Sequence, residues 1–339
     1  MDLTTVWFVL IAVLWTGYLV LEGFDFGVGM LLAPLSRDDT ERRTLLATIG
    51  PVWDGNEVWL LVAGGATFAA FPEWYASMFS GFHLALLLVL VALVLRAVAF
   101  EFRGKVDDVR WRARWDRCIA VGSWVPSLLW GVAFANLVRG VPMDADHRFT
   151  GTLLTLLNPY ALLGGLALLT VFLAHGAAFL ALRTLGEVRE RAARAAGVLA
   201  PVALVVAGTW AVLTQVRYGA TWTWGAVAPA AGSLVVAVLA GRRRREGTAF
   251  AATAVAIVAV VVLVFGSLFP DVMPSSTSPL NSLTVQNAAS SHYTLVVMTW
   301  VAAVLTPLVL LHQGWTYWVF RRRIGVHHVP APAPAAATR

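Results

Sequence analysis

Two carboxylate side chains stand at the start of an apolar stretch, GPVWDGNEVWLLVAGGATFAA, which covers residues 50–70. Asp54 and Glu57 are three residues apart, so a helix would place both side chains on one face. A charged carboxylate inside a membrane is costly, and such residues commonly pair with a partner or take part in proton relays. Proton uptake and transfer are therefore the candidate chemistry of this stretch.

Further charged residues lie in the apolar stretches on either side. Glu22 and Asp25 are one helical turn apart in the preceding stretch, and Arg96 and Glu101, the expected charge partners, lie near the end of the following one. Short loops favour antiparallel neighbours, so we expect these residues to meet in a helix bundle. The small residues that would allow close helix approach are Gly23, Gly27, Gly29, Gly64 and Gly65.

The acidic cluster has two interpretations. Its carboxylates line a proton path, or the cluster only fixes helix packing, with Arg96 paired to Asp25 or Asp54. Asp54 also has the position of a helix N-cap. Trp53 and Trp59 flank the acids, and either they pack between helices or they contact a quinone, a haem edge or a partner subunit. The residues alone do not decide between these interpretations.

The composition excludes a soluble protein. Of the 339 residues, 59% are hydrophobic and 13% are charged, against roughly 25% charged residues in soluble domains, and the mean hydropathy is +0.74. Apolar runs of about 20 residues, each long enough to cross a bilayer, recur along the chain. The net charge of +6 comes from basic residues in the short segments between these runs, which excludes a nucleic-acid-binding protein.

We predict an all-α polytopic membrane protein with nine transmembrane helices. They cover about residues 6–32, 51–70, 77–101, 117–138, 158–182, 198–216, 224–241, 248–269 and 292–320. The N-terminus lacks the basic segment of a cleaved signal peptide, so we expect the first helix to be retained. Residues 1–328 form a single transmembrane domain, and the Pro- and Ala-rich residues 329–339 form a disordered cytoplasmic tail.

The basic residues predict the orientation of the chain. Of the 25 Lys and Arg residues, 21 follow odd-numbered spans, and only Arg139, Arg148 and Arg217 fall in the loops on the other side. Cytoplasmic loops carry the excess of positive charge in membrane proteins. The N-terminus is therefore predicted outside and the C-terminus inside, which places the acidic cluster in the cytoplasmic half of the membrane.

The potential metal ligands are few and scattered. Cys118 is the only cysteine, so the chain has no internal disulfide and no thiolate metal site. His83, His175, His292 and His312 lie in or beside spans, without a tight ligand spacing on one helix. A lone membrane histidine is more often hydrogen-bonded packing than an iron ligand, and we predict no metal site in this chain.

No phosphate-binding loop, nucleophile motif or soluble catalytic domain points to a reaction. The residues favour a half-channel for protons from the cytoplasm. A proton-coupled secondary transporter is the alternative from another class, with the same acids as its coupling site. Transporters usually have broken helices near the midplane in both halves, whereas the polar residues here gather at one end of the early helices. A purely scaffolding subunit is the third interpretation.

Several stretches together resemble subunit II of cytochrome bd-type quinol oxidases. The resemblance is most specific in WDGNEVWL and VMPSST, and it covers nearly the whole chain in the expected order. The matching stretches are GFDFGVGML (23–31), DDTERR (38–43), GPVWDGNEVWLLVAGGATFAAFP (50–72), residues 96–115, GSWVPSLLWGVAFANLVRGVP (122–142), NPYALLGGL (158–166), FPDVMPSSTS (269–278) and MTWVAAVLTPLVLL (298–311).

This resemblance implies two four-helix bundles plus one peripheral helix, which agrees with nine spans. It implies a heterodimer with a similarly folded subunit I that holds two haems b and one haem d, while this chain binds no cofactor by itself. The complex would oxidise quinol, reduce O₂ to water with cytoplasmic protons, and generate proton motive force across the bacterial cytoplasmic membrane. Small accessory membrane subunits are further expected partners. Asp25 and Asp54 stand where the family motifs carry acids of a proton path toward haem d.

Overall fold

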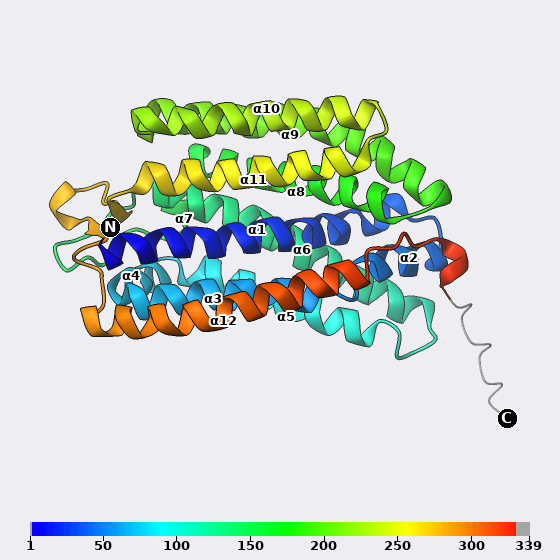
Figure 1. Cartoon of the computed structure of the whole chain (residues 1–339), viewed down its shortest axis with the longest axis horizontal. Coiled ribbons are helices and arrows are strands. Elements are labelled where there is room, and N and C mark those ends of the chain that lie inside the picture. The colour runs from blue at the N-terminus through cyan, green and yellow to red at the C-terminus, as the bar shows by residue number, and fades with distance from the viewer. Residues whose placement is uncertain (1, 330–339) are drawn as a thin grey trace.

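The computed structural model describes residues 2–329, and these are almost entirely helical (Figure 1). Within these residues, eight helices are long and apolar enough to cross a membrane, and they run along the longest axis of the molecule. They are α1 (Leu3–Leu35), α5 (His83–Phe102), α6 (Val109–Arg139), α8 (Pro159–Arg183), α9 (Gly186–Tyr218), α10 (Trp224–Arg242), α11 (Glu246–Leu268) and α12 (His292–Val319). The prediction of an all-α polytopic membrane protein is confirmed.

The remaining elements of the described residues are four other α-helices, two short strands and three 3₁₀ turns. The other α-helices are α2 (Asp39–Ile49), α3 (Trp53–Ala70), α4 (Pro72–Gly81) and α7 (Leu153–Leu156). Two strands, β1 (Asp271–Met273) and β2 (Leu283–Thr284), pair antiparallel in the connection before α12. Three single 3₁₀ turns are η1 (Thr221–Thr223), η2 (Pro279–Asn281) and η3 (Val326–His328).

The helices differ from the predicted spans in three places. α3 corresponds to the predicted span 51–70 but is not among the eight, because the polar residues of its first turns lower its hydropathy. The predicted span 77–101 is wrong at its start, since the chain breaks at Phe82 between α4 and α5. The predicted span 198–216 is only part of the longer α9. The predicted tail, 329–339, lies outside the described residues except for Val329.

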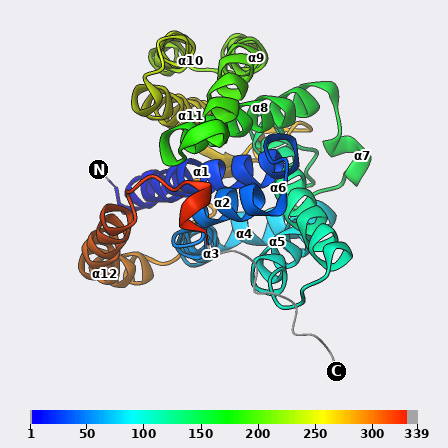
Figure 2. The same cartoon turned by 90° about the vertical axis from the view of Figure 1, so that its right-hand side faces the viewer.

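α1 lies at the centre of the molecule, with the other long helices around it (Figure 2). Every residue from Glu22 to Leu32 is buried, so this half of α1 is enclosed on all sides. α8, α9, α10 and α11 pack against one another on one side of α1, and α3, α5 and α6 lie on the other. α12 lies on the outside, and Leu295 is its only buried residue.

Glycine residues allow close approach between α1 and its neighbours. A Cβ atom on Gly27 would lie 2.6 Å from the Cα atom of Gly176, so the backbones of α1 and α8 are in direct contact. Gly29 leaves room for a side chain of α6, because a Cβ atom on it would lie 2.0 Å from the Ser123 hydroxyl oxygen. A Cβ atom on Gly64 or Gly65 would meet nothing within 4 Å. The prediction of close approach through small residues is therefore confirmed for α1 and wrong for these two glycines of α3.

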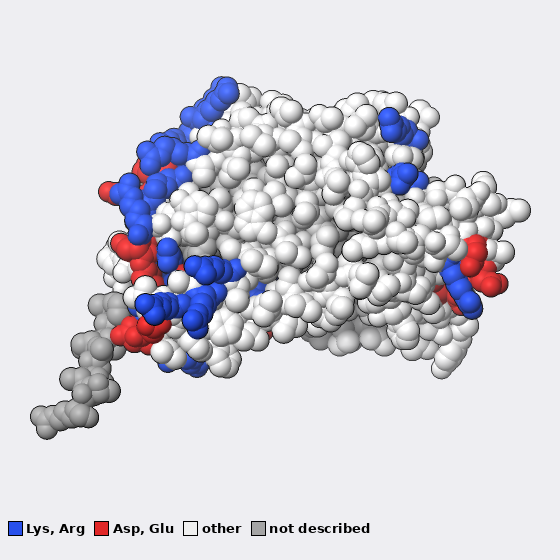
Figure 3. All heavy atoms as spheres, turned by 180° about the vertical axis from the view of Figure 1, so that it is seen from behind, with Lys and Arg blue, Asp and Glu red and all other residues white. Residues whose placement is uncertain are grey.

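Basic side chains gather at one end of the molecule (Figure 3). This end carries α2, the connection between α5 and α6, and the end of α12, and we call it the basic end. α1 runs toward the basic end, and α3 starts from it. Arg96 differs from the other basic residues because its side chain is wholly buried inside the helix bundle.

Candidate functional site

A buried ion pair joins α1 to α5. The guanidinium group of Arg96 binds the carboxylate of Glu22, and neither side chain has any exposed surface. The rings of Phe26 and Phe100 flank the guanidinium carbon, with centroids 4.8 Å and 5.2 Å away. The prediction that Arg96 pairs with Asp25 or Asp54 is therefore wrong: Glu22, one turn earlier on α1, is its partner.

Asp25 is fully buried and is held from α3 rather than from α5. The side-chain amide of Asn56 donates a hydrogen bond of 2.7 Å to Asp25 Oδ2, and Asn56 is itself fully buried. The second oxygen, Asp25 Oδ1, has no hydrogen-bond partner among the described residues. One oxygen of this carboxylate is thus fixed, and the other can accept a proton without breaking a bond to the protein.

The acceptor side of Asn56 faces α12. Asn56 Oδ1 accepts hydrogen bonds from the Tyr317 hydroxyl at 2.8 Å and from the Gln313 amide at 3.1 Å. Trp59 donates its indole N–H to Gln313 Oε1 at 2.8 Å. Sequence reasoning did not select Asn56, Gln313 or Tyr317. A signal was present, because Gln313 and Tyr317 are polar residues four positions apart on one face of an apolar helix.

Three predicted acids are less buried than Glu22 and Asp25. Asp54 is exposed, Glu57 is half-buried, and Glu101 is exposed near the end of α5. Asp54 occupies the first turn of α3, and Val52 is the N-cap residue, so the N-cap prediction for Asp54 is wrong. From the basic end inward, burial therefore increases from Asp54 through Glu57 to Asp25.

The two predicted tryptophans both pack within this chain. The Trp53 ring lies 4.8 Å from the ring of Phe100 on α5, measured between centroids. Trp59 fills the space beside Gly17, where a Cβ atom would be 2.2 Å from the indole ring. Both tryptophans are half-buried, so each keeps some surface on the outside of the chain. Contact with another subunit remains a prediction.

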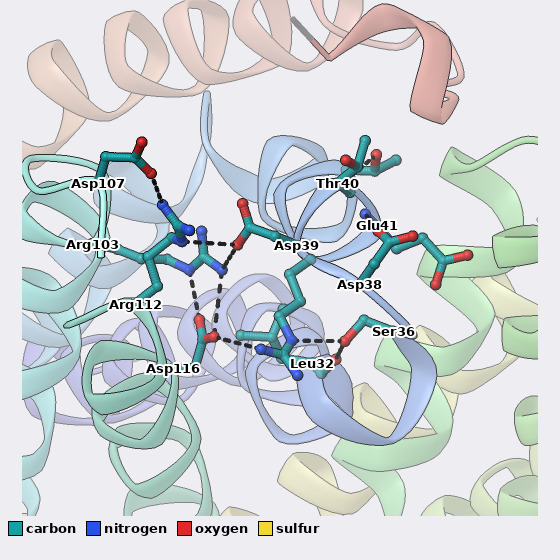
Figure 4. A network of polar contacts seen from close by, with 12 residues as sticks. Leu32, Ser36, Asp38, Asp39, Thr40, Glu41, Arg103, Asp107, Arg112 and Asp116 are labelled. Carbon is teal, nitrogen blue, oxygen red and sulfur yellow. Dashed lines mark hydrogen bonds and ion pairs between the residues drawn. The ribbon is translucent and has the colours of Figure 1, made fainter. Parts of the chain in front are cut away.

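A second charged network holds α2 at the basic end (Figure 4). Arg103, at the end of α5, binds Asp116 of α6 at 2.5 Å and Asp39 of α2 at 2.7 Å. Arg42 of α2 reaches Asp116 at 3.2 Å, and Arg112 of α6 lies 3.6 Å from Asp39. These ion pairs tie α2 to the ends of α5 and α6, close to the point where α3 begins.

Arg103 is the most enclosed member of the network at the basic end. Burial would lower the pKa of its guanidinium, but hydrogen bonds to Asp116 and Asp39 outweigh this effect and hold the pKa above its usual value. Arg103 therefore stays charged, and its two carboxylate partners keep their positions. The network fixes the connection between α1 and α3, and so the direction in which α3 enters the bundle.

His175 of α8 is packed and hydrogen-bonded, as expected for a lone membrane histidine. Its Nε2 lies 3.1 Å from the carbonyl oxygen of Val20, and its Nδ1 lies 2.7 Å from the Thr253 hydroxyl. Its ring stacks on Phe250 at 4.5 Å between centroids. Within residues 2–329, no three His, Cys, Asp or Glu side chains are grouped so that they could hold a metal ion.

A comparison of the sequence with known protein families identifies the family of this chain. The family described as cytochrome bd terminal oxidase subunit II matches residues 3–320. The chain belongs to this family. It is therefore a subunit of a multi-pass membrane oxidase, as the resemblance implied, and this membership removes the secondary transporter as an alternative.

Other bacterial subunits II are similar to it over nearly their whole length. The chain is 42% identical over 328 residues to cytochrome bd ubiquinol oxidase subunit 2 of Bacillus subtilis, covering 95% of this chain and 97% of that protein. It is 40% identical over 357 residues to cytochrome bd-I ubiquinol oxidase subunit 2 of Escherichia coli K12, with 94% of each covered. The charged residues of the buried cluster and of the network at the basic end all lie within the matched family region.

A solved structure has the same fold as this subunit II. The bd oxidase from Geobacillus thermodenitrificans contains a chain that superposes with a TM-score of 0.76 at 17% identity. The superposition covers 94% of this chain and 99% of that one. At this identity the comparison establishes the fold, and the roles of single residues have to be argued from the contacts described above.

Proposed function

We propose that this chain is the non-haem subunit II of a quinol:O₂ oxidoreductase, and that Asp25 carries protons inward from the basic end. The observation that carries the proposal is the fully buried Asp25 carboxylate, whose Oδ1 has no partner among the described residues. Ionisable residues within transmembrane helices commonly belong to proton relays. The names of the similar subunits, which are ubiquinol oxidase subunits, support the class of reaction.

In this proposal the complex contains a subunit I with two haems b and one haem d. Quinol is oxidised there, and O₂ is reduced to water. Because the protons come from the cytoplasm, turnover generates proton motive force. This chain contributes the frame that supports subunit I and the route that brings protons toward haem d.

The proposed topology has nine spans, with α3 as the second. α1, α3, α5 and α6 form one four-helix bundle, α8 to α11 form the other, and α12 is the peripheral helix. The basic end faces the cytoplasm, because positive charge is kept on that side of a membrane. The N-terminus is then outside and the C-terminus inside, in the bacterial cytoplasmic membrane.

The proton path follows the increase in burial along α3 and α1. Asp54 is exposed at the entrance, and Glu57 lies one turn further into the membrane. Asp25 takes up the proton on Oδ1 while Asn56 keeps hold of Oδ2. Glu22 is the next carboxylate along α1, with one oxygen bound by Arg96 and Oε2 unpartnered among the described residues. Ordered water commonly completes the hydrogen bonds of such buried polar atoms and can link them.

The face of α3 near the two tryptophans is proposed to meet subunit I. Val58, Leu61 and Phe68 expose 45%, 71% and 58% of their surfaces, so this face is apolar and open to the outside of the chain. Trp53 and Trp59 lie partly exposed on the same helix. A contact here would place the acids of the path next to the redox subunit. Small accessory subunits and lipid would cover other outer helices.

The test is to compare oxygen consumption with haem content in the purified complex carrying Asp25→Asn. Asparagine has nearly the same shape as aspartate but carries no exchangeable acid proton. We expect turnover with quinol to fall strongly while haem content and subunit composition stay normal. Full turnover in a normally assembled variant would contradict the role of Asp25. A purified chain without a haem-bearing partner would contradict the oxidase complex itself.

A further inference from the structure

The hydrogen bonds between α12 and α3 have a common direction. Trp59 donates to Gln313 Oε1, Gln313 donates through Nε2 to Asn56 Oδ1, and Asn56 donates through Nδ2 to Asp25 Oδ2. The Tyr317 hydroxyl adds a second donor to Asn56 Oδ1 at 2.8 Å. Every N–H or O–H in this chain of contacts therefore points toward Asp25.

This direction fixes the orientation of the Asn56 amide. An amide can in principle be turned by half a rotation, which exchanges its oxygen and its NH₂ group. In the turned state the NH₂ group would face the Gln313 donor, which the indole N–H of Trp59 keeps in its orientation, and the oxygen would face the Asp25 carboxylate. Both contacts would be repulsive, so Gln313 holds the NH₂ group of Asn56 toward Asp25. The Tyr317 hydroxyl, which can donate or accept, adds a hydrogen bond to the Asn56 oxygen in this orientation. The 3.4 Å contact of Asn56 Nδ2 with the Leu21 carbonyl favours the same orientation.

α12 makes few other buried contacts that could hold it in this position. Leu295, near its beginning, is its only buried residue, and Trp7 of α1 binds there to the carbonyl of Leu295 at 3.2 Å. The second attachment is the cluster of Gln313 and Tyr317 around Asn56, at the depth of the acids. At this second attachment α12 is joined to α3 through polar contacts that end on Asp25.

We infer that Gln313 and Tyr317 are positioning residues, through which α12 sets the hydrogen bonding of the proton-carrying carboxylate of Asp25. This inference rests on the proposed role of Asp25. Loss of either donor weakens the hold on the Asn56 amide, and with it the hydrogen bond that Asn56 donates to Asp25 Oδ2. A buried carboxylate that loses such a partner changes both its hydrogen-bonded state and its readiness to exchange a proton.

The experiment measures the infrared absorption of protonated carboxyl groups and the oxygen consumption of the purified complex during turnover. The Asp25 band is identified as the one that disappears in Asp25→Asn. Tyr317→Phe removes one donor, and Gln313→Leu removes the other together with the link to Trp59. The matched control is Thr316→Val on the same helix, because among residues 2–329 the Thr316 hydroxyl bonds only to its own helix, at the carbonyl of His312.

We expect Tyr317→Phe and Gln313→Leu to shift the Asp25 band and to lower turnover several-fold, with haem content unchanged. Thr316→Val should leave the band and the rate as they are. An Asp25 band that is present but unmoved in both variants would overturn the inference and leave the proposed function standing. If no band depends on Asp25, the carboxyl does not exchange a proton during turnover, and the proposed function fails with it.

Discussion

The guanidinium of Arg96 on α5 is bound to the carboxylate of Glu22 on α1 at a point where both side chains are completely buried. Two aromatic rings, Phe26 and Phe100, enclose the guanidinium, and its Nε and Nη2 have no hydrogen-bond partner among the described residues. Such a pair is costly to bury and still more costly to break, because one partner alone would be an uncompensated charge.

Arg96→Leu is expected to destabilise the complex by about 3–5 kcal/mol, because Glu22 would be left buried without its counter-charge. Thermal unfolding of the purified complex and its yield measure this effect. Replacing both partners, Arg96→Leu with Glu22→Leu, should restore a large part of the stability. The control is Arg37→Leu, whose partner Glu187 is 74% exposed like Arg37 at 66%, and which should cost at most about 1 kcal/mol. Equal losses in the single and double variants would contradict the pairing.

Asp25→Asn and Asp54→Asn should lower turnover of the complex by different amounts. Asp25 is fully buried and has no substitute at its position, so its loss should lower turnover by about tenfold or more. Asp54 is exposed, where water can deliver protons directly to Glu57, so its loss should have a smaller effect. The measurement is oxygen consumption per haem. A larger loss in Asp54→Asn than in Asp25→Asn would mean that access at the entrance, and not transfer at Asp25, limits the rate.

Gly27→Ala is expected to weaken the contact between α1 and α8. The new Cβ atom would lie 2.3 Å from the carbonyl oxygen of Phe172 and 2.6 Å from the Cα atom of Gly176, and overpacking of this kind costs about 1–3 kcal/mol. The temperature at which the complex loses its activity reports the change. The matched control is Gly232→Ala on the exposed side of α10, where a Cβ atom meets nothing within 4 Å. A Gly27→Ala complex as stable as the control would show that the two helices can separate at little cost.

Asp271 should make stability depend on pH at the end opposite the basic end. It lies on β1, outside the transmembrane helices, and burial raises the pKa of its carboxyl. The folded protein therefore favours the protonated acid, and stability is lost as pH rises above the unfolded pKa of about 3.9. Asp271→Asn should raise the unfolding temperature near neutral pH, and the gain should shrink as the pH is lowered toward 4. Asp146→Asn, an exposed residue in a neighbouring loop, is the control, and an equal change there would argue against burial as the cause.

Hydropathy alone predicted most of the long helices, including α10, because nearly all of each is apolar. It misplaced the start of α5, since the apolar run continues through the break at Phe82 and composition carries no sign of the bend. It also shortened α9, whose first turns are charged and extend beyond the apolar segment. Apolar composition indicates which residues can lie in lipid. It does not indicate where a helix begins, because a helix can extend into the water outside the membrane.

The acidic cluster was predicted in outline because Glu22, Asp25 and Arg96 were expected to meet from neighbouring helices. Which acid binds Arg96 depends on the rotation of α1 about its own axis, and two acids one turn apart left this open. The contacts of Asn56 with Gln313 and Tyr317 join residues more than 250 positions apart. No local pattern reports such a contact, which depends on where α12 docks on the finished bundle.

The position of α12 has a consequence for how the protein is made. Asp25 belongs to α1, which leaves the ribosome well before α12, the helix of Gln313 and Tyr317. The hydrogen bonds that orient Asn56 cannot form until α12 has been synthesised and inserted. A chain arrested before α12 would contain every carboxylate of the path, yet its central acid would not have its finished surroundings. Synthesis and insertion of α12 thus become a requirement for a working proton route.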